Sequence, residues 1–315
     1  MRVAAVDLGT NSTRLLVADV AGGRIDELAR RLRITRLGEG VDAGGRLLAT
    51  AMARVHRCLA AYEREAEALG AERTLAIATS AVRDAENGEA FLEQIEQRFR
   101  FRTRLLSGDE EAALTFRGVT SGRAVAEGTL VVDIGGGSTE LVLGGPAGVS
   151  WAVSLQIGSV RLTERFLASD PPTRRELEAC ARHVRAALPV LEPAAAIGVA
   201  GTVTTLATLD LGLERWDPER THGHLLTRAA VAAQLARLAA LPLARRERVR
   251  GLEPARAPVI VAGALILHEL LAAYALREVE TSERDILHGA ALVAAELPAG
   301  EQARARTREL RSSPS

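Results

Sequence analysis

The chain has 315 residues, of which 47% are hydrophobic and 25% charged, the profile of a globular protein long enough for two domains. Lys and Arg total 40 and Asp and Glu total 40, so the overall charge favours neither nucleic acid nor a membrane surface as a partner. The two cysteines, Cys58 and Cys180, form no CxxC pair, which argues against a disulfide scaffold or zinc site and favours a cytoplasmic location.

The first half of the chain predicts the order β-β-β-α-β-α-β-α. Short apolar runs predict strands, and helical spacing of apolar residues predicts helices. The expected strands are 2–7, 13–20, 24–35, 73–80 and 102–106, and the expected helices are 47–69, 89–98 and 109–119. A strand that begins at residue 2 is not expected to be a signal peptide. The small, polar segment 120–128 is the expected boundary between one domain of residues 1–122 and another of residues 123–315.

The second half repeats the same order of elements. Strands are expected at 129–133, 140–143, 150–154, 196–200 and 278–281, and helices at 159–167, 174–188, after 201–205, and at 228–238, 245–249 and 255–275. A last helix, about 285–311, is expected to pack back on the first domain, and 304–315 is expected to fray. The apolar stretch 257–276 contains His268 and Glu269, so it is interpreted as a core helix, not a membrane span. Duplicated units of this kind predict an α/β fold with a cleft between two domains.

One loop sequence occurs twice in the chain, as residues 6–15 (VDLGTNSTRL) and residues 132–141 (VDIGGGSTEL). Each copy predicts a strand, a tight turn and a second strand. Such a turn offers backbone N–H groups and hydroxyls to an anion, and the Asp at the strand end can hold a cation or a water molecule. Two such turns that face each other would bind a phosphate chain from both sides.

Four segments narrow the fold to a family: residues 78–83 (ATSAVR), 106–112 (LSGDEEA), 131–140 (VVDIGGGSTE) and 199–202 (VAGT). In this order and spacing they resemble the exopolyphosphatase/guanosine pentaphosphate phosphohydrolase family, in its short, two-domain form, to about residue 297. The resemblance implies two ribonuclease-H-like domains of the actin-like ATPase superfold. It also implies hydrolysis, dependent on Mg²⁺ (or Mn²⁺), of the terminal phosphoanhydride of inorganic polyphosphate, with guanosine pentaphosphate (pppGpp) as a further substrate.

The resemblance implies three catalytic carboxylates, Glu111, Asp133 and Glu140, and Glu111 is the one assigned to activating water. The residues alone leave other interpretations open. Glu111 follows an N-cap sequence and would also complement the helix dipole. Asp133 could stabilise an Asx turn, and Glu140 could be an exposed strand residue. Asp7 repeats the position of Asp133, so the expected metal ligands are Asp7, Asp133 and Glu140.

The expected phosphate ligands are Asn11, Ser12, Thr13, Arg14, Arg83, Gly135, Gly136, Gly137, Ser138, Gly201 and Thr202. Glycines allow close backbone approach to an anion, although they also suit a strained hairpin. Arg83, expected at the end of a buried strand, offers a planar fork for bidentate phosphate recognition. Arg14 could instead be a strand-surface residue, and residues 201–202 an ordinary strand-to-helix turn. Arg256 is a weaker candidate.

Some features leave the function open. His222 and His224 have no third ligand at metal spacing and are interpreted as loop residues. Residues 285–289 (DILHG) stand where many family members carry Leu-Arg-Glu-Gly, so any role of that Arg and Glu is in doubt here. An ATP-dependent kinase of the same superfold and a non-catalytic regulator that binds an alarmone or polyphosphate are the rival hypotheses. Oligomeric state, including a homodimer, is not determined by the sequence.

Overall fold

The structure is a computed structural model that describes residues 1–99 and 101–298; the segment expected to fray and the end of the last expected helix lie outside these ranges. The first half contains β1 (Arg2–Leu8), β2 (Ser12–Ala21), β3 (Arg24–Ile34), α1 (Val41–Gly44), α2 (Ala49–Ala68), β4 (Arg73–Ala78), α3 (Ser80–Arg83), α4 (Gly88–Arg98), β5 (Arg102–Leu105) and α5 (Gly108–Thr120).

The second half contains six further strands and several helices. They are β6 (Thr129–Ile134), β7 (Thr139–Gly145), β8 (Gly148–Leu155), α6 (Ser159–Phe166), α7 (Arg174–Ala187), β9 (Ala195–Val199), α8 (Ala200–Asp210), α9 (Pro218–Thr221), β10 (Leu225–Thr227), α10 (Arg228–Ala239), α11 (Leu243–Arg246), a 3₁₀ turn (Pro254–Arg256), α12 (Ile260–Ala273), β11 (Glu278–Thr281) and α13 (Ile286–Glu296).

The two halves form two sheets of related topology. Their strand orders are β3-β2-β1-β4-β5 and β10-β11-β9-β6-β7-β8. In each sheet the strand before the repeated loop pairs antiparallel with the strand after it, and parallel with the next strand on its other side. This duplicated arrangement confirms the predicted α/β fold of two ribonuclease-H-like domains.

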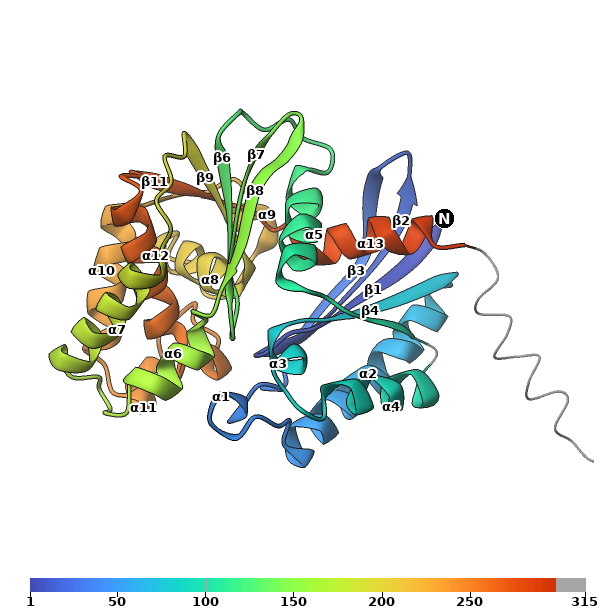
Figure 1. Ribbon diagram of the computed structural model, residues 1–315, viewed down its shortest axis with the longest axis horizontal. Helices are drawn as coiled ribbons and strands as arrows, with labels where there is room; N and C mark the ends of the chain where they lie inside the picture. The colour runs from blue at the N-terminus through green and yellow to red at the C-terminus, as the bar shows by residue number, and fades with distance from the viewer. Residues whose placement is uncertain (100, 299–315) are drawn as a thin grey trace, which may run out of the picture.

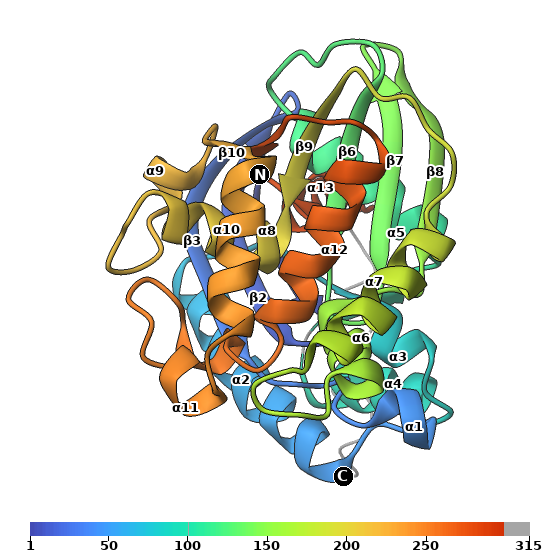
Figure 2. The same ribbon diagram turned by 90° about the vertical axis from the view of Figure 1, so that its left-hand side faces the viewer.

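Alternation along β1 explains why the first sheet is covered on both faces. Ala4 and Val6 pack with α2 and α4, whereas Val3 and Ala5 pack with α5 and α13. The last described helix therefore lies on the first sheet, beside β1 and β2 (Figure 1). We propose a domain division near residue 122, with α13 returning to the first domain. On the second sheet, α6, α7, α8, α10 and α12 cover the face away from α5 (Figure 2).

Helix α5 connects the two sheets, because Leu114 packs into the first core and Phe116 into the second. It also crosses α13 at close range. A Cβ on Gly118 would lie 1.9 Å from the Asp285 carbonyl oxygen, and one on Gly289 would lie 2.1 Å from the Leu114 carbonyl oxygen. Both positions need glycine for this crossing, which brings the N-terminus of α13 to the interface between the domains.

Local differences from the predicted elements have simple causes. Strand β4 ends at Ala78 and the chain turns into the one-turn helix α3, so Arg83 lies on a helix and not at the end of a strand. The expected irregular insert 213–225 contains α9, and β10 begins at its last residue and adds an edge strand to the second sheet.

Within the described residues, no helix is long and apolar enough to span a membrane. The apolar helix α12 is buried in the second core, as expected.

Candidate active site

A cavity of about 580 Å³ lies between the two sheets, where the repeated loops meet. Gly137 is in close contact with the other domain, since a Cβ there would lie 2.4 Å from Ser80 Oγ and 3.0 Å from Thr10 Oγ1. The two loops therefore face each other, as the sequence repeat predicts. Of the predicted site residues, those that line the cavity are Asp7, Asn11, Ser12, Arg14, Glu111, Asp133, Gly135, Gly136, Gly137, Ser138, Gly201 and Thr202.

The two loops have the same internal geometry. The N–H of Gly9 donates to the Ser12 carbonyl at 3.0 Å, and the N–H of Gly135 donates to the Ser138 carbonyl at the same distance. Asp7 lies opposite Arg14 in the first hairpin, as Asp133 lies opposite Glu140 in the second. The repeat in sequence is thus a repeat in backbone structure.

The peptide groups of the second loop are oriented by helix α6. Its first turn donates backbone N–H groups to two loop carbonyls, from Ser159 to Gly135 at 2.9 Å and from Val160 to Gly136 at 2.8 Å. In a trans peptide the N–H points opposite to the carbonyl. The N–H groups of Gly136 and Gly137 therefore point away from α6, the arrangement of an anion-binding nest.

The first loop is held in the same way by the segment that follows β3. The Thr10 carbonyl accepts the Gly38 N–H at 2.8 Å, and the Asn11 carbonyl accepts the N–H groups of Thr35 and Arg36. The N–H groups that follow these carbonyls point the other way. Both loops can thus present backbone donors to one phosphate chain.

Glu111 is positioned by the N-terminus of α5. Ser107 and Glu110 form a capping box, so Glu110 has the helix-capping role that the sequence left open for this segment. Glu111 instead turns inward and is 8% exposed. Its Oε2 accepts a hydrogen bond from Arg83 Nη1 at 3.1 Å. The carboxylate that the family resemblance selects is therefore the buried one, at the cavity wall.

Three buried carboxylates share this part of the site. Burial, together with the nearby charge of Glu140, raises the pKa of Glu111 well above its ordinary value, although Arg83 opposes the shift. Burial and Glu140 also raise the pKa of Asp133 to about 8. Burial raises the pKa of Glu140, against hydrogen bonds from Ser154 and Ser138. A carboxyl group with a pKa moved toward neutrality suits a general base.

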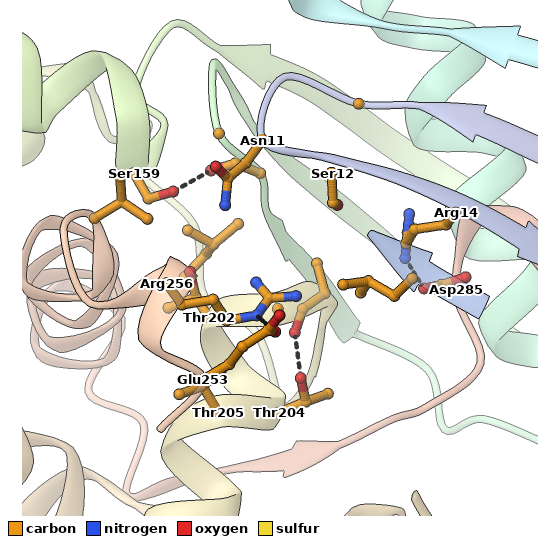
Figure 3. Close-up of a pocket in the computed structure, with 18 of the residues that line it drawn as sticks. Asn11, Ser12, Arg14, Ser159, Thr202, Thr204, Thr205, Glu253, Arg256 and Asp285 are labelled. Atoms are coloured by element: carbon orange, nitrogen blue, oxygen red, sulfur yellow. Dashed lines mark hydrogen bonds and ion pairs between the residues drawn. The ribbon is translucent and has the colours of Figure 1, made fainter. Parts of the chain in front are cut away.

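Arg14 is bound by two carboxylates. Its Nε donates to Asp7 Oδ2 at 2.8 Å, and its Nη1 pairs with Asp285 at the start of α13 (Figure 3). Burial alone would raise the pKa of Asp285, but Arg14, His288 and Arg30 together lower it below the usual range. Arg14 lines the cavity, and its charge is already compensated by these carboxylates. Asp285 is a site residue that the sequence analysis did not include.

Three predicted residues lie outside the cavity lining. Thr13 is fully buried and its hydroxyl pairs with Thr35 Oγ1 at 2.9 Å, because successive strand residues point to opposite faces. Its predicted contact with phosphate is therefore wrong for this structure. Glu140 is buried and accepts a hydrogen bond from Ser154 Oγ at 2.7 Å. Arg83 reaches Glu111 and the Leu106 carbonyl, and its Nη2 is buried without a hydrogen-bond partner.

The third predicted segment, Gly201 and Thr202, begins α8 on the far wall of the cavity. A Cβ on Gly201 would lie 1.8 Å from Arg256 Nη1, so the glycine lets the guanidinium lie directly against the backbone. Arg256 is 14% exposed, and its ion pair with Glu253 is long, at 3.5 Å. Figure 3 shows its guanidinium directed into the cavity. Arg256, considered only a weak candidate from the sequence, is therefore placed to bind an anion in the cavity.

The two histidines singled out in the sequence have separate partners. His224 Nε2 pairs with Asp210 at 2.8 Å, and His222 Nδ1 accepts the Glu283 N–H at 3.2 Å. Among the described residues, no three His, Cys, Asp or Glu side chains are grouped as a metal site. The predicted ligands Asp7, Asp133 and Glu140 thus do not form a complete protein-only site.

Arg83→Lys is expected to lower kcat/KM about tenfold or more while the melting temperature changes little. The Lys ammonium keeps the charge, but it loses the fork that spans Glu111 and the Leu106 carbonyl. Steady-state phosphate release and thermal unfolding of both proteins would measure this. Arg237→Lys, on the surface helix α10, is the control. A loss of activity that only follows a loss of folded protein would make Arg83 purely structural.

The chain is similar to known proteins over most of its length. Residues 16–295 match the Ppx/GppA phosphatase family. Exopolyphosphatase 2 of Mycobacterium tuberculosis is 39% identical over 317 aligned residues, which cover 92% of this chain and 98% of that protein.

Two solved structures are similar over nearly the full chain. An exopolyphosphatase-like protein superposes with a TM-score of 0.88 at 34% identity, and the match covers 95% of this chain and 100% of the other. A Ppx/GppA family member from Aquifex aeolicus superposes with a TM-score of 0.77 at 31% identity, with 95% and 99% covered. Since the family match spans residues 16–295 and the relative is 39% identical over 92% of this chain, the chain belongs to the Ppx/GppA phosphatase family.

Proposed function

We propose that this protein is an exopolyphosphatase, which hydrolyses the terminal phosphoanhydride of inorganic polyphosphate. The observation that carries the proposal is the cavity in which two backbone-donor loops, Arg256 and the buried Glu111 converge. The relative at 39% identity is itself named an exopolyphosphatase. Phosphoryl transfer needs positioning and charge stabilisation more than covalent chemistry, and these groups supply both.

The charge of the cavity supports a requirement for a divalent cation. Within the described part of the chain it is lined by seven carboxyl and five guanidinium side chains, and a phosphate placed beside the carboxyl groups favours a cation between them. Asp7 Oδ1 is buried without a hydrogen-bond partner, and Asp133 lies on the opposite loop. Mg²⁺ is commonly held by one or two carboxylates together with substrate phosphates, so this donor set fits Mg²⁺ or Mn²⁺. When bound, the cation would neutralise charge on the phosphate oxygens.

The remaining roles are assigned to residues of this chain. Glu111 accepts the proton of the attacking water, Arg83 fixes the Glu111 carboxylate, and the N–H groups of residues 11–12 and 136–138 bind the phosphates. Arg256 binds a phosphate further along the substrate. Arg14 holds Asp7 in place for the cation.

Guanosine pentaphosphate is a second candidate substrate because one wall of the cavity is apolar. Beyond Arg256 the lining includes Leu252, Pro254, Val259 and Ile260. Such a wall suits a nucleoside, whereas a polyphosphate chain has no apolar part. We propose polyphosphate as the main substrate and pppGpp as the alternative.

Phosphate release from polyphosphates of several lengths, pppGpp and ATP would test the function. We expect turnover of polyphosphate with Mg²⁺ or Mn²⁺, and loss of turnover after EDTA that is restored by adding Mg²⁺. Full turnover after exhaustive EDTA treatment would require another role for Asp7 and Asp133. Binding of polyphosphate without phosphate release would favour a non-catalytic regulator, and ATP-dependent transfer to an acceptor would favour a kinase.

A further inference from the structure

We propose that Arg161, in the first turn of α6, is a positioning residue that couples closure of the two domains to the shape of the second glycine loop. The inference rests on the proposed function, since this loop affects turnover only if it binds phosphate. The Arg161 side chain is 11% exposed and lies outside the lining of the active-site cavity. It acts through the Gly137–Ser138 peptide.

Arg161 contacts the second glycine loop directly. The carbonyls of Gly135 and Gly136 are held by backbone N–H groups of α6, which no side-chain substitution removes. The next carbonyl, that of Gly137, accepts a hydrogen bond from Arg161 Nε at 2.7 Å. Because the N–H of a trans peptide points opposite to its carbonyl, this side chain sets the direction of the Ser138 N–H.

Arg161 also contacts the first domain. Nη1 of Arg161 pairs with Asp42 of α1, and Nη2 pairs with Asp84, the residue after α3. Nη2 also lies 3.4 Å from Ser80 Oγ. The guanidinium that holds the Gly137 carbonyl is therefore itself held by carboxylates of the opposite domain. If the domains separate, both carboxylates move away and the Nε hydrogen bond loses its support.

Among the described residues, the carbonyls of the first loop are held by their own domain. At the equivalent position, the Asn11 carbonyl accepts backbone N–H groups of Thr35 and Arg36 at 3.0 and 2.9 Å, all within the first domain. The peptides of the first loop are thus oriented by groups of its own domain, while the last peptide of the second loop is oriented by a side chain that carboxylates of the other domain hold. A phosphate chain would meet a complete pair of loops only in the closed state.

Arg165 provides a matched control on the same helix. One turn after Arg161, it also pairs with Asp42, with its Nη2 2.6 Å from Asp42 Oδ1. Its side chain is 41% exposed, and none of its hydrogen bonds or ion pairs with the described residues reaches the glycine loop. Arg165→Met therefore removes an interdomain ion pair and leaves the Gly137 carbonyl contact in place.

The kinetic test compares the two substitutions with polyphosphate as substrate. We expect Arg161→Met to lower kcat at least tenfold with less than a threefold change in KM, because closure follows substrate binding. Arg165→Met should lower kcat less than threefold. Arg161→Lys should not restore kcat, since an ammonium cannot span Gly137, Asp42 and Asp84. Equal losses in Arg161→Met and Arg165→Met, or rescue by lysine, would overturn the proposal.

A second measurement does not depend on turnover. Amide hydrogen exchange of the peptide over residues 134–141 should be faster in Arg161→Met and in the double variant Asp42→Asn/Asp84→Asn, and unchanged in Arg165→Met. Unchanged exchange in the double variant would overturn the coupling between the domains. If the wild-type protein releases no phosphate from polyphosphate, the proposed function fails, and this measurement still decides the role of Arg161.

Discussion

Glu111→Gln is expected to lower kcat for phosphate release by roughly two to four orders of magnitude, the usual contribution of a general base. KM should change little, because glutamine keeps the size of the side chain and its hydrogen bond with Arg83. What it loses is the ability to accept a proton from water. Steady-state kinetics with polyphosphate and Mg²⁺ would measure the effect.

The pH profile gives a second readout of Glu111. Burial and the charge of Glu140 raise its pKa, and the base works only when deprotonated. In the wild-type protein, kcat/KM should therefore fall as the pH is lowered through a value above the ordinary range of glutamate. The residual activity of Glu111→Gln should not show this fall at low pH.

Glu110→Gln is the control for Glu111→Gln, since the two residues are adjacent on the same helical turn. Glu110 accepts the Ser107 N–H at 2.8 Å and is exposed at the helix N-terminus. Its substitution should cost about 0.3–1 kcal/mol of stability, the range for losing a negative charge near a helix N-terminus, and leave kcat within threefold. Near-normal turnover in Glu111→Gln would remove Glu111 from the mechanism.

The sequence predicted the fold well where the signal is local. The ten-residue repeat predicts both hairpins and both loops because strand, glycine turn and strand are encoded within each copy. Strand residues also alternate between the two faces of the sheet, and this alternation excludes Thr13 from the cavity. Ser12 and Arg14 line the cavity, so the residue between them points to the opposite face of the sheet and into the core. Period-two reasoning would have removed Thr13 from the predicted ligands.

The sequence could not predict contacts between distant segments. Arg14 and Asp285 are 271 positions apart, and Arg161 and Asp42 are 119 apart. No local pattern links such residues, since the crossing of α5 and α13 and the meeting of the domains bring them together. The only feature of the sequence that drew attention to this region was segment 285–289, which departs from the Leu-Arg-Glu-Gly of many family members. Its His288 is buried and pairs with Glu27 at 2.9 Å, which shows that the departure from the family pattern is accommodated within the first domain.

Asp133→Asn is expected to reduce activity by about two orders of magnitude or more and, at alkaline pH, to stabilise the fold. Burial and the charge of Glu140 raise the pKa of Asp133 from 3.8 to about 8. Between about pH 4 and pH 8 the folded protein thus holds a proton that the unfolded chain releases. The folded state binds more protons in this window, so the free energy of unfolding falls as the pH rises through it.

Asparagine removes this dependence, because it needs no proton to stay neutral. At about pH 8.5 the melting temperature of Asp133→Asn should exceed that of the wild-type protein by a few degrees, and the difference should shrink toward pH 5. Asp285→Asn, in contrast, should lower the melting temperature. It removes a carboxylate that Arg14 and Arg30 need, and loss of one partner from a buried ion pair costs about 3–5 kcal/mol. Thermal unfolding followed by circular dichroism across this pH range would measure both variants. If Asp133→Asn melts below the wild-type protein at pH 8.5, the Asp133 carboxylate is stabilised by its surroundings, and the electrostatic description of the site fails.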